Sequence, residues 1–305
     1  MEQWAHLATA TVLKTLDTIV LRTHDDRVVK LYRPHRQKLM ERMPGIGQFL
    51  SFANARYPSL HLQTPLQTQV EAVDYGQIKG RESDPRWLVT YPWRAGKPVR
   101  RITPQVCFHM GQKMAQLHLA AEQATLNLDL THIDAQLLAD ILVLTKQSVL
   151  FEQVSTENQR AFTQKMNGLV AFIGNWGKTP EQYGLIHSDL HFSNWLRNGN
   201  ELTPIDFDEL AYGHYLTDLA VVCNEIKLSS PIAGIDTCEK ALLHGYQKHR
   251  KLPKDLVGTL EKFKLTALTL YLNWLLLPEN KMILAEKSKQ KFVLDIISHI
   301  SQSLG

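Results

Sequence analysis

The chain has 305 residues, enough to bury one large core or two smaller ones. Its hydrophobic fraction of 44% and charged fraction of 21% are typical of a soluble globular protein. The net charge of +4, from 34 basic and 30 acidic residues, is too small to indicate a nucleic acid partner. Basic clusters at residues 30–38 and 248–254 are therefore interpreted as solvated surface, and no nucleic acid binding is expected.

Cysteine usage and apolar runs limit the cellular setting. Cys107, Cys223 and Cys238 have neither metal-binding spacing nor the pattern of a disulfide framework, so we expect a reducing cytoplasm. The first 14 residues lack the long apolar core of a signal peptide. The longest apolar run, residues 265–277, is too short to span a bilayer, so it predicts a buried helix and no membrane partner. The sequence leaves the oligomeric state open.

Strand patterns dominate the first part of the chain. Residues 11–22 alternate toward an apolar Ile-Val-Leu stretch, residues 24–26 form a predicted turn, and residues 27–32 form the return strand. Two later segments, residues 67–75 and 87–91, also have strand character. These patterns predict a small antiparallel sheet.

Helical periodicity replaces this pattern after a linker that contains Pro92 and residues 94–98. Apolar residues fall on one helical stripe within residues 106–121 and on another within residues 162–176. Strands followed by helices predict an α+β fold, with a small N-terminal antiparallel sheet lobe and a larger helical C-terminal lobe. We place the division after Pro92, giving a nucleotide-binding lobe of residues 1–92 and a catalytic and substrate-binding lobe of residues 93–305. Two-lobe clefts hold ligands at the junction.

Lys30 is the one lysine in the strand of residues 27–32, and its neighbours there are apolar. Because strand side chains alternate, it shares a sheet face with Val28 and Tyr32. One interpretation is a lysine that snorkels at a sheet edge. The other, which we favour because of the loop described next, is a lysine directed into a cleft to hold nucleotide phosphates.

Residues 185–210 carry the strongest functional signal. The apolar segment 184–186 leads into a polar loop, and residues 195–198 and 202–207 form two predicted strands joined by an Asn-Gly-Asn turn. This hairpin would bring Asn194 and Asp206 to neighbouring strand ends.

The polar residues of this segment suit phosphoryl transfer, which needs positioning, metal ions on the phosphates and one acceptor for the hydroxyl proton. Asp189 is the candidate acceptor, and Asn194 and Asp206 carry the oxygen ligands that Mg²⁺ prefers. Asp208 lies two residues after Asp206, so in an extended segment both carboxylates would share one face and repel each other unless a cation joins them. A plain solvated turn is the alternative interpretation.

The ordered set His-x-Asp-Leu-His-x-x-Asn, residues 187–194, followed by Ile-Asp-Phe-Asp, residues 205–208, resembles the aminoglycoside phosphotransferase, choline kinase and homoserine kinase superfamily. That superfamily shares the protein-kinase fold. The strand Val-Val-Lys-Leu-Tyr-Arg-Pro, residues 28–34, is similar to that of the bacterial stress response kinase A type. The likeness continues into a Gly-x-x-x-Ala-x-Leu-His helix that ends at His118, which is interpreted as a packed residue.

The resemblance implies further roles. Adenine would contact backbone groups of the linker, and because Pro92 has no N–H, the donor would be Tyr91 or Trp93. A rigid linker is the plainer interpretation of the same residues. Asp218 resembles the aspartate that holds the catalytic loop, and an ordinary helix N-cap is the alternative.

Two features depart from the family pattern. The first hairpin, residues 14–17, has no glycine, so a glycine-rich phosphate cover is missing and Thr15 is a candidate helper. Residues 43–49 are expected to break a helix where the family has an acidic partner for the lysine, and Glu41 or Glu71 is a possible substitute.

The sequence therefore predicts an ATP- and Mg²⁺-dependent phosphotransferase that phosphorylates a hydroxyl of a small molecule. Asp189 is the expected base, Asn194, Asp206 and Asp208 are the metal candidates, and Lys30 holds the phosphates. Two alternatives stay open: a protein Ser/Thr kinase of the stress response kinase A type, and a nucleotide-binding pseudokinase. The acceptor, and the choice between ATP and GTP, cannot be read from the sequence.

Overall fold

The computed structural model describes all residues except 1–6, 8, 16–17, 67–69, 230–231 and 304–305. The chain forms two compact units. The first unit contains residues 1–99, 123–130 and 193–208, and the second contains residues 100–122, 131–192 and 209–305. The division after Pro92 concerned functional lobes and stays a prediction.

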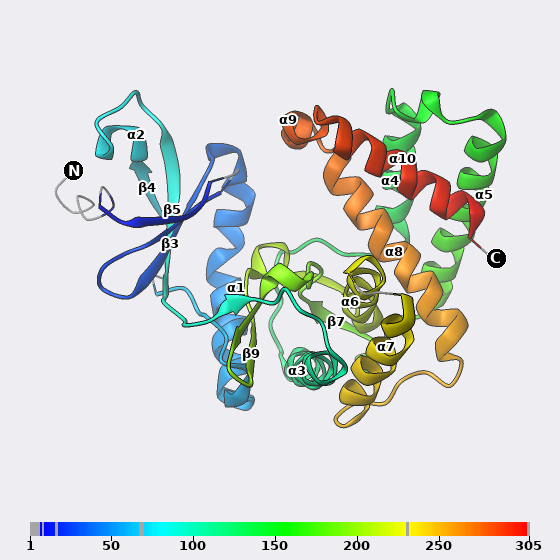
Figure 1. Cartoon of the computed structure of the whole chain (residues 1–305), viewed down its shortest axis with the longest axis horizontal. Coiled ribbons are helices and arrows are strands. Elements are labelled where there is room, and N and C mark those ends of the chain that lie inside the picture. Colours follow the sequence, from blue (N-terminus) through cyan, green and yellow to red (C-terminus); the bar gives the residue numbers. More distant parts are fainter. Residues whose placement is uncertain (1–6, 8, 16–17, 67–69, 230–231, 304–305) are drawn as a thin grey trace. The chain divides into compact units, whose positions relative to one another are not determined.

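A five-stranded antiparallel sheet with strand order β1-β2-β3-β5-β4 forms the centre of the first unit (Figure 1). Its strands are β1 (Thr11–Thr15), β2 (Ile19–Arg22), β3 (Arg27–Tyr32), β4 (Glu71–Asp74) and β5 (Pro85–Pro92). This unit also contains α1 (Gln37–Arg56), α2 (Tyr75–Ile78), and a second sheet of β6 (Lys97–Pro98), β8 (Trp195–Asn198) and β9 (Glu201–Pro204).

The second unit is mostly helical, around the antiparallel pair β7 (Tyr183–Ile186) and β10 (Ala211–His214). Its helices are α3 (Pro104–Gln123), α4 (Ala135–Gln147), α5 (Thr156–Asn175), α6 (Tyr215–Ser229), α7 (Ile232–Gln247), α8 (Leu256–Leu276), α9 (Lys281–Leu284) and α10 (Lys287–Gln302). Helix α8 contacts α4, α6 and α10 (Figure 1). An antiparallel sheet followed by a larger helical region confirms the predicted α+β class.

Side-chain alternation gives the main sheet two distinct faces. Leu21, Val29 and Leu31 lie in one buried apolar cluster, which also contains Tyr75. Lys30 belongs to the opposite face, as the alternation predicted. The predicted helical stripes are also buried, with Met110 and Phe162 fully enclosed.

Three predicted element boundaries were wrong. Helix α1 runs without a break through Pro44, because its apolar residues recur every three or four positions and are buried, from Met40 to Ala53. The second strand of the 195–207 hairpin ends at Pro204, and a short 3₁₀ turn over Phe207–Glu209 follows. In the expected strand 67–75, residues 67–69 lie outside the described part, and the strand covers Glu71–Asp74.

Along the described residues, every helix is too short or too polar to cross a membrane. The apolar run at residues 265–277 belongs almost entirely to α8, where Thr269, Leu272 and Leu275 are buried. The predicted buried helix is confirmed.

Helices α3 and α7 approach closely at two glycines. A Cβ added at Gly111 would lie 2.0 Å from the carbonyl oxygen of Leu242, and one added at Gly245 would lie 1.9 Å from that of Phe108. We expect Gly111→Ala to lower the free energy of unfolding by about 1–3 kcal/mol, because the helices must separate to admit the methyl group. Urea denaturation measures this change.

Gly168→Ala on α5 is the matched control, because an added Cβ there has open space. Alanine is the better helix former, so this variant should be more stable by about 0.5–1 kcal/mol. Equal behaviour of the two variants would contradict the tight crossing of α3 and α7.

Candidate active site

The hairpin of β8 and β9 places two of the predicted metal-binding residues. Trp195 pairs with Pro204, and Gly199 takes a positive φ of 60° in the turn. The backbone N–H of Ile205 donates to the carbonyl of Asn194 at 2.9 Å. Asn194 therefore lies beside the residue that precedes Asp206, and the predicted meeting of these strand ends is confirmed.

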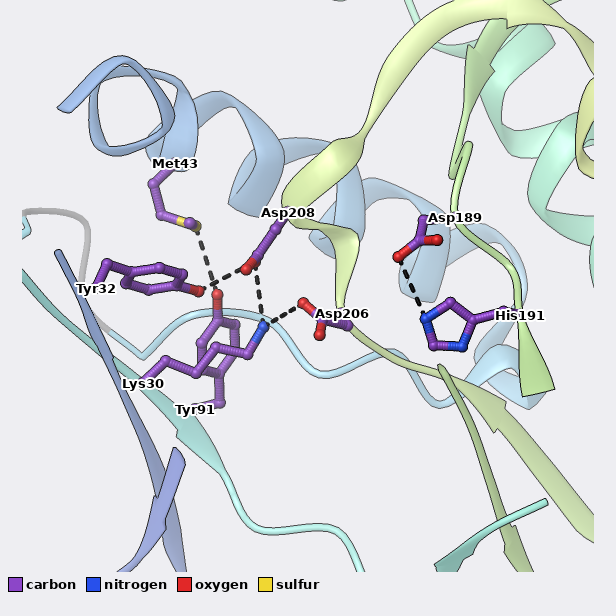
Figure 2. A network of polar contacts seen from close by, with 8 residues as sticks. All are labelled: Lys30, Tyr32, Met43, Tyr91, Asp189, His191, Asp206 and Asp208. Atoms are coloured by element: carbon purple, nitrogen blue, oxygen red, sulfur yellow. Dashed lines mark hydrogen bonds and ion pairs between the residues drawn. The ribbon is translucent and has the colours of Figure 1, made fainter. Parts of the chain in front are cut away.

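Lys30 lies between two carboxylates of the first unit (Figure 2). Its Nζ donates to Oδ1 of Asp206 at 2.5 Å and to Oδ1 of Asp208 at 3.1 Å. The hydroxyl of Tyr32 donates to the same oxygen of Asp208 at 3.0 Å. Lys30 thus meets two of the residues that the sequence assigned to metal, and the snorkelling alternative does not fit this contact.

The two aspartates converge through a turn and not through an extended strand. Asp206 has a φ of 68°, in the left-handed region that non-glycine residues rarely adopt. Asp208 lies in the 3₁₀ turn that follows. The expectation of an extended segment was therefore wrong, although both carboxylates reach the same amine. Strained backbone of this kind occurs preferentially at functional sites.

Burial and charge together set the protonation of this cluster. Burial alone lowers the pKa of Lys30, but the carboxylates of Asp206 and Asp208 outweigh it and raise that pKa above its ordinary value. Burial raises the pKa of Asp206, and Lys30 reverses the shift so that the pKa falls below the usual range. Burial and the neighbouring Asp206 raise the pKa of Asp208 to about 6, against the opposing effect of Lys30. Lys30 therefore stays protonated between the two carboxylates.

Neither glutamate that we considered as a partner for Lys30 is bonded to it. The carboxylate of Glu41 accepts from Gln37 on the exposed side of α1, and Glu71 lies on β4 opposite Leu88. Among the described residues, the carboxylates that bond Lys30 are those of Asp206 and Asp208. On α1, the sulfur of Met43 accepts from the Tyr91 hydroxyl at 3.5 Å.

A small cavity of about 30 Å³ lies at this cluster within the first unit. Apolar side chains from β3, α1 and the β9–β10 connection enclose the amine and carboxylate. The lining residues are Val28, Lys30, Ile46, Leu50, Gln63, Tyr91, Ile205, Asp206 and Phe207. Tyr91, assigned to the nucleotide from the sequence, thus shares this cavity with Lys30.

The linker backbone differs from expectation. The N–H of Trp93 donates to the carbonyl of Asp26 at 2.8 Å. Hydrogen-bonded pairs recur every second residue along an antiparallel ladder. Tyr91 lies two residues before Trp93 and pairs with Val28, so its N–H also faces β3. The Pro92 carbonyl accepts from the side-chain amide of Gln63 at 2.8 Å. The backbone N–H groups of Tyr91 and Trp93, which were expected to donate to a base, therefore face the sheet instead. A nucleotide contact by their side chains stays a prediction.

The predicted catalytic loop belongs to the second unit, directly after β7. Ser188 has a positive φ of 64°, and its hydroxyl donates to the carbonyl of Glu209 at 2.5 Å. The backbone N–H of Asp189 donates to Nδ1 of His187 at 3.3 Å. The Asp189 carboxylate is 43% exposed and lies 3.5 Å from Nε2 of His191 (Figure 2). The loop backbone is thus constrained, while the Asp189 side chain is half-exposed.

Asp218 anchors this loop from α6. Its Oδ1 accepts from the N–H of Ser188 at 2.7 Å, and its Oδ2 accepts from the N–H of His187 at 3.0 Å. The role implied by the resemblance is confirmed. The N-cap alternative was wrong, because Asp218 is the fourth residue of α6, which begins at Tyr215.

His118 is a participant that the sequence reading missed. Its Nε2 lies 3.0 Å from Oδ2 of Asp218, and its Nδ1 lies 3.0 Å from the hydroxyl of Tyr246. Since a carboxylate only accepts, Nε2 carries the proton and Nδ1 accepts from Tyr246. The Gly-x-x-x-Ala-x-Leu-His pattern that ends at His118 was the available signal in the sequence. It does not by itself identify Asp218 as the partner of the ring, because the two residues are far apart in the chain.

Comparison with known proteins decides the family. The model of the phosphotransferase enzyme family (APH) matches residues 15–254, more than three quarters of the chain. The chain belongs to this family. The match includes Lys30, the loop with Asp189 and the segment with Asp206 and Asp208.

Two curated relatives share parts of the sequence. Homoserine kinase of Neisseria meningitidis is 27% identical over 157 residues, covering 50% of this chain and 47% of the relative. Amicoumacin kinase of Bacillus subtilis is 29% identical over 80 residues, covering 26% of this chain and 24% of the relative. The chain thus matches about half the length of the first relative and a quarter of the second.

Solved structures of the family share the fold over nearly the whole chain. An amicoumacin kinase in complex with AMP-PNP, Ca²⁺ and Ami superposes with a TM-score of 0.72 at 16% identity, covering 96% of this chain and 87% of the other. A microcompartment-associated aminopropanol kinase superposes with a TM-score of 0.70 at 19% identity, covering 96% and 91%. These similarities confirm the kinase-like fold that the resemblance implied.

The loop anchor makes stability depend on pH. Burial lowers the pKa of His118 below its ordinary value, against the opposing effect of Asp218, so the folded ring is neutral. As pH falls below about 6.5, the unfolded chain binds a proton that the folded chain does not, and stability is lost. We expect wild-type protein to lose up to about 1.4 kcal/mol per pH unit more than His118→Gln between pH 6.5 and 5.5.

Urea unfolding at a series of pH values measures this slope. His249→Gln, at an exposed position after α7, is the control and should keep the wild-type slope. Parallel curves for wild type and His118→Gln would show that His118 does not titrate differently in the two states.

Proposed function

We propose that the protein is an ATP-dependent kinase that transfers the γ-phosphoryl group to a hydroxyl of a small molecule. The observation that carries the proposal is the Lys30 amine held by Asp206 and Asp208 beside the hairpin of Asn194. Membership of the phosphotransferase family supports the same reaction. The reaction needs positioned charge more than covalent chemistry, and this cluster provides it.

Asp189 is proposed to orient the acceptor hydroxyl and take its proton. The substrate oxygen forms a bond to the γ-phosphorus, the bond from that phosphorus to the bridging oxygen breaks, and ADP leaves. The Asp189 carboxylate is exposed enough to meet a substrate, and the anchor at Asp218 fixes the backbone just before it. A positioned base of this kind contributes about 10²–10⁴ in rate.

The donors present fit a Mg²⁺ ion. Asn194 and Asp206 supply amide and carboxylate oxygens at adjoining backbone positions, which is the chemistry that Mg²⁺ prefers. Within the described part of the chain, no group of three or more acidic, histidine or cysteine side chains is arranged to hold a metal. Mg²⁺ would therefore complete its shell with nucleotide phosphates and water, and when bound it would neutralise phosphate charge.

Lys30 is proposed to hold the nucleotide phosphates, with the Tyr91 and Trp93 side chains on the base side. The amine approaches the ring of Tyr91 to 5.5 Å and that of Tyr32 to 5.9 Å. The guanidinium of Arg22 lies 4.2 Å from the centroid of the Trp93 ring, so that side chain has a cation–π contact with β2. The amine would exchange a carboxylate for a phosphate when the nucleotide enters.

The names of the relatives guide the choice of acceptor. Homoserine, aminopropanol, choline and ethanolamine are the namesake substrates of related kinases, and each carries an amino or ammonium group besides its hydroxyl. We propose an amine-bearing alcohol for this chain. Two acidic residues of the helical unit are candidates to face the amine: Glu225 is half-buried on α6, whereas Asp236 pairs with Lys240 on the exposed face of α7.

Two alternatives are kept for the same experiment. A protein Ser/Thr acceptor of the stress response kinase A type rests on the strand of residues 28–34. The pseudokinase alternative rests on the missing acidic partner of Lys30.

We also propose a reducing cytoplasm as the setting, supported by the buried free thiols of Cys107, Cys223 and Cys238.

Asp189→Ala should bind ATP with wild-type affinity and lose at least about 100-fold in turnover, because only the proton acceptor is removed. Mg²⁺-dependent ADP release is measured with amino alcohols, sugars, aminoglycosides and a protein acceptor. Asp140→Asn, an exposed carboxylate on α4, is the control and should keep wild-type turnover. Wild-type turnover in Asp189→Ala would sink the assignment, and stimulation by the protein acceptor alone would establish the first alternative.

Asp206→Ala should remove the Mg²⁺ dependence of nucleotide binding, since the carboxylate that would face the ion is gone. Calorimetry of ADP with Mg²⁺ and with EDTA measures this as a ratio of affinities. A ratio equal to that of wild type would exclude Asp206 as a metal ligand.

A further inference from the structure

We propose that Asp208, held by Tyr32, is the standing partner of Lys30 and takes the place of the acidic residue missing from helix α1, so that it positions the lysine and does not bind the metal. This inference rests on the proposed kinase function. It changes the role that the sequence suggested for Asp208.

The contacts separate the two aspartates. The Oδ1 of Asp208 accepts two hydrogen bonds, from Lys30 at 3.1 Å and from the Tyr32 hydroxyl at 3.0 Å. The Asp206 carboxylate accepts from Lys30 at 2.5 Å, and its other side-chain hydrogen bond among the described residues is to Asp208 itself, so no residue outside the pair holds it as Tyr32 holds Asp208. A carboxylate with a second fixed donor stays in place when the amine moves toward a phosphate. Asp206 is the one free to turn to a cation.

The burial of the two aspartates also supports Asp206 as the metal ligand and Asp208 as the partner of Lys30. The side chain of Asp208 is 14% exposed and that of Asp206 is 28% exposed, while Tyr32 is fully buried. A Mg²⁺ ion keeps several water ligands, so its protein ligands need access to solvent. Asp206 meets this condition better than Asp208.

The helix itself leaves the position open. At Met43, α1 directs a thioether toward the Tyr91 hydroxyl, and a thioether cannot neutralise an amine. Glu41 is bonded to Gln37 on the exposed side of the same helix.

The pairing has a consequence for the variants. Asp208→Asn should impair the enzyme through Lys30, lowering kcat/KM for ATP by about 10–100-fold, the range expected when one partner of a charged pair is removed. The double variant with Lys30→Met should be no worse than Lys30→Met alone. The ratio of ADP affinities with Mg²⁺ and with EDTA should stay within about twofold of wild type, unlike that of Asp206→Ala.

Tyr32→Phe tests the anchor with little change in shape. It should raise the KM for ATP about 3–10-fold, the effect of one lost hydrogen bond, with kcat and the ADP affinity ratio unchanged. Tyr75→Phe is the matched control, because Tyr75 packs against the opposite face of the sheet, and it should behave as wild type. Circular dichroism and urea denaturation establish that each variant is folded.

The outcomes separate this inference from the proposed function. Loss of the Mg²⁺ effect in Asp208→Asn, to the same extent as in Asp206→Ala, would make Asp208 a metal ligand and overturn the inference. Additive losses with Lys30→Met, or a Tyr32→Phe variant identical to Tyr75→Phe, would overturn it as well. Absence of nucleotide binding in wild-type protein would instead remove the proposed function itself.

Discussion

The buried amine of Lys30 is the constraint around which the first unit is organised. A charge taken out of water is tolerated only with close partners, and its partners come from a segment more than 170 residues later in the chain. The β8–β9 hairpin and the turn after it place both carboxylates beside Lys30 of β3. The left-handed backbone of Asp206 is part of that delivery, because the chain turns there into the 3₁₀ turn that carries Asp208.

A second buried carboxylate plays the corresponding role in the other unit. Asp218 receives two backbone amides of the loop before Asp189 and the ring of His118. Replacing it would leave several buried donors unsatisfied, which costs more than any one of the bonds contributes. The tightly held loop fixes where Asp189 begins, while the Asp189 carboxylate itself stays half-exposed. The backbone of the loop is thus held rigidly, while the side chain of Asp189, the proposed base, stays accessible.

The sequence predicted what depends on local pattern. Period-two and period-3.6 apolar patterns predicted the sheet, the helical stripes and the face of Lys30, and the Asn-Gly-Asn turn predicted the hairpin that joins Asn194 to the Asp206 segment. It failed where burial in three dimensions overrides a local signal. Pro44 was expected to break α1, but the buried stripe around it keeps the helix intact. The contact of Lys30 with Asp208, and that of His118 with Asp218, join residues 178 and 100 positions apart, so no local pattern could show them.

Charge balance explains why the proposed nucleotide and metal sites have to act together. One lysine with two aspartates leaves a site that carries no excess positive charge for a triphosphate, and Lys14 and Arg36 contribute only as more distant favourable charges on Asp206 and Asp208 respectively. Phosphates brought to Lys30 would meet the carboxylate of Asp206 unless a cation lies between them. In the proposed roles, the carboxylate that turns to the cation is the more exposed of the two, and the one that remains with the lysine is the one held by Tyr32. Electrostatics and geometry therefore support the same proposed roles, with Asp206 as the metal ligand and Asp208 as the partner of Lys30.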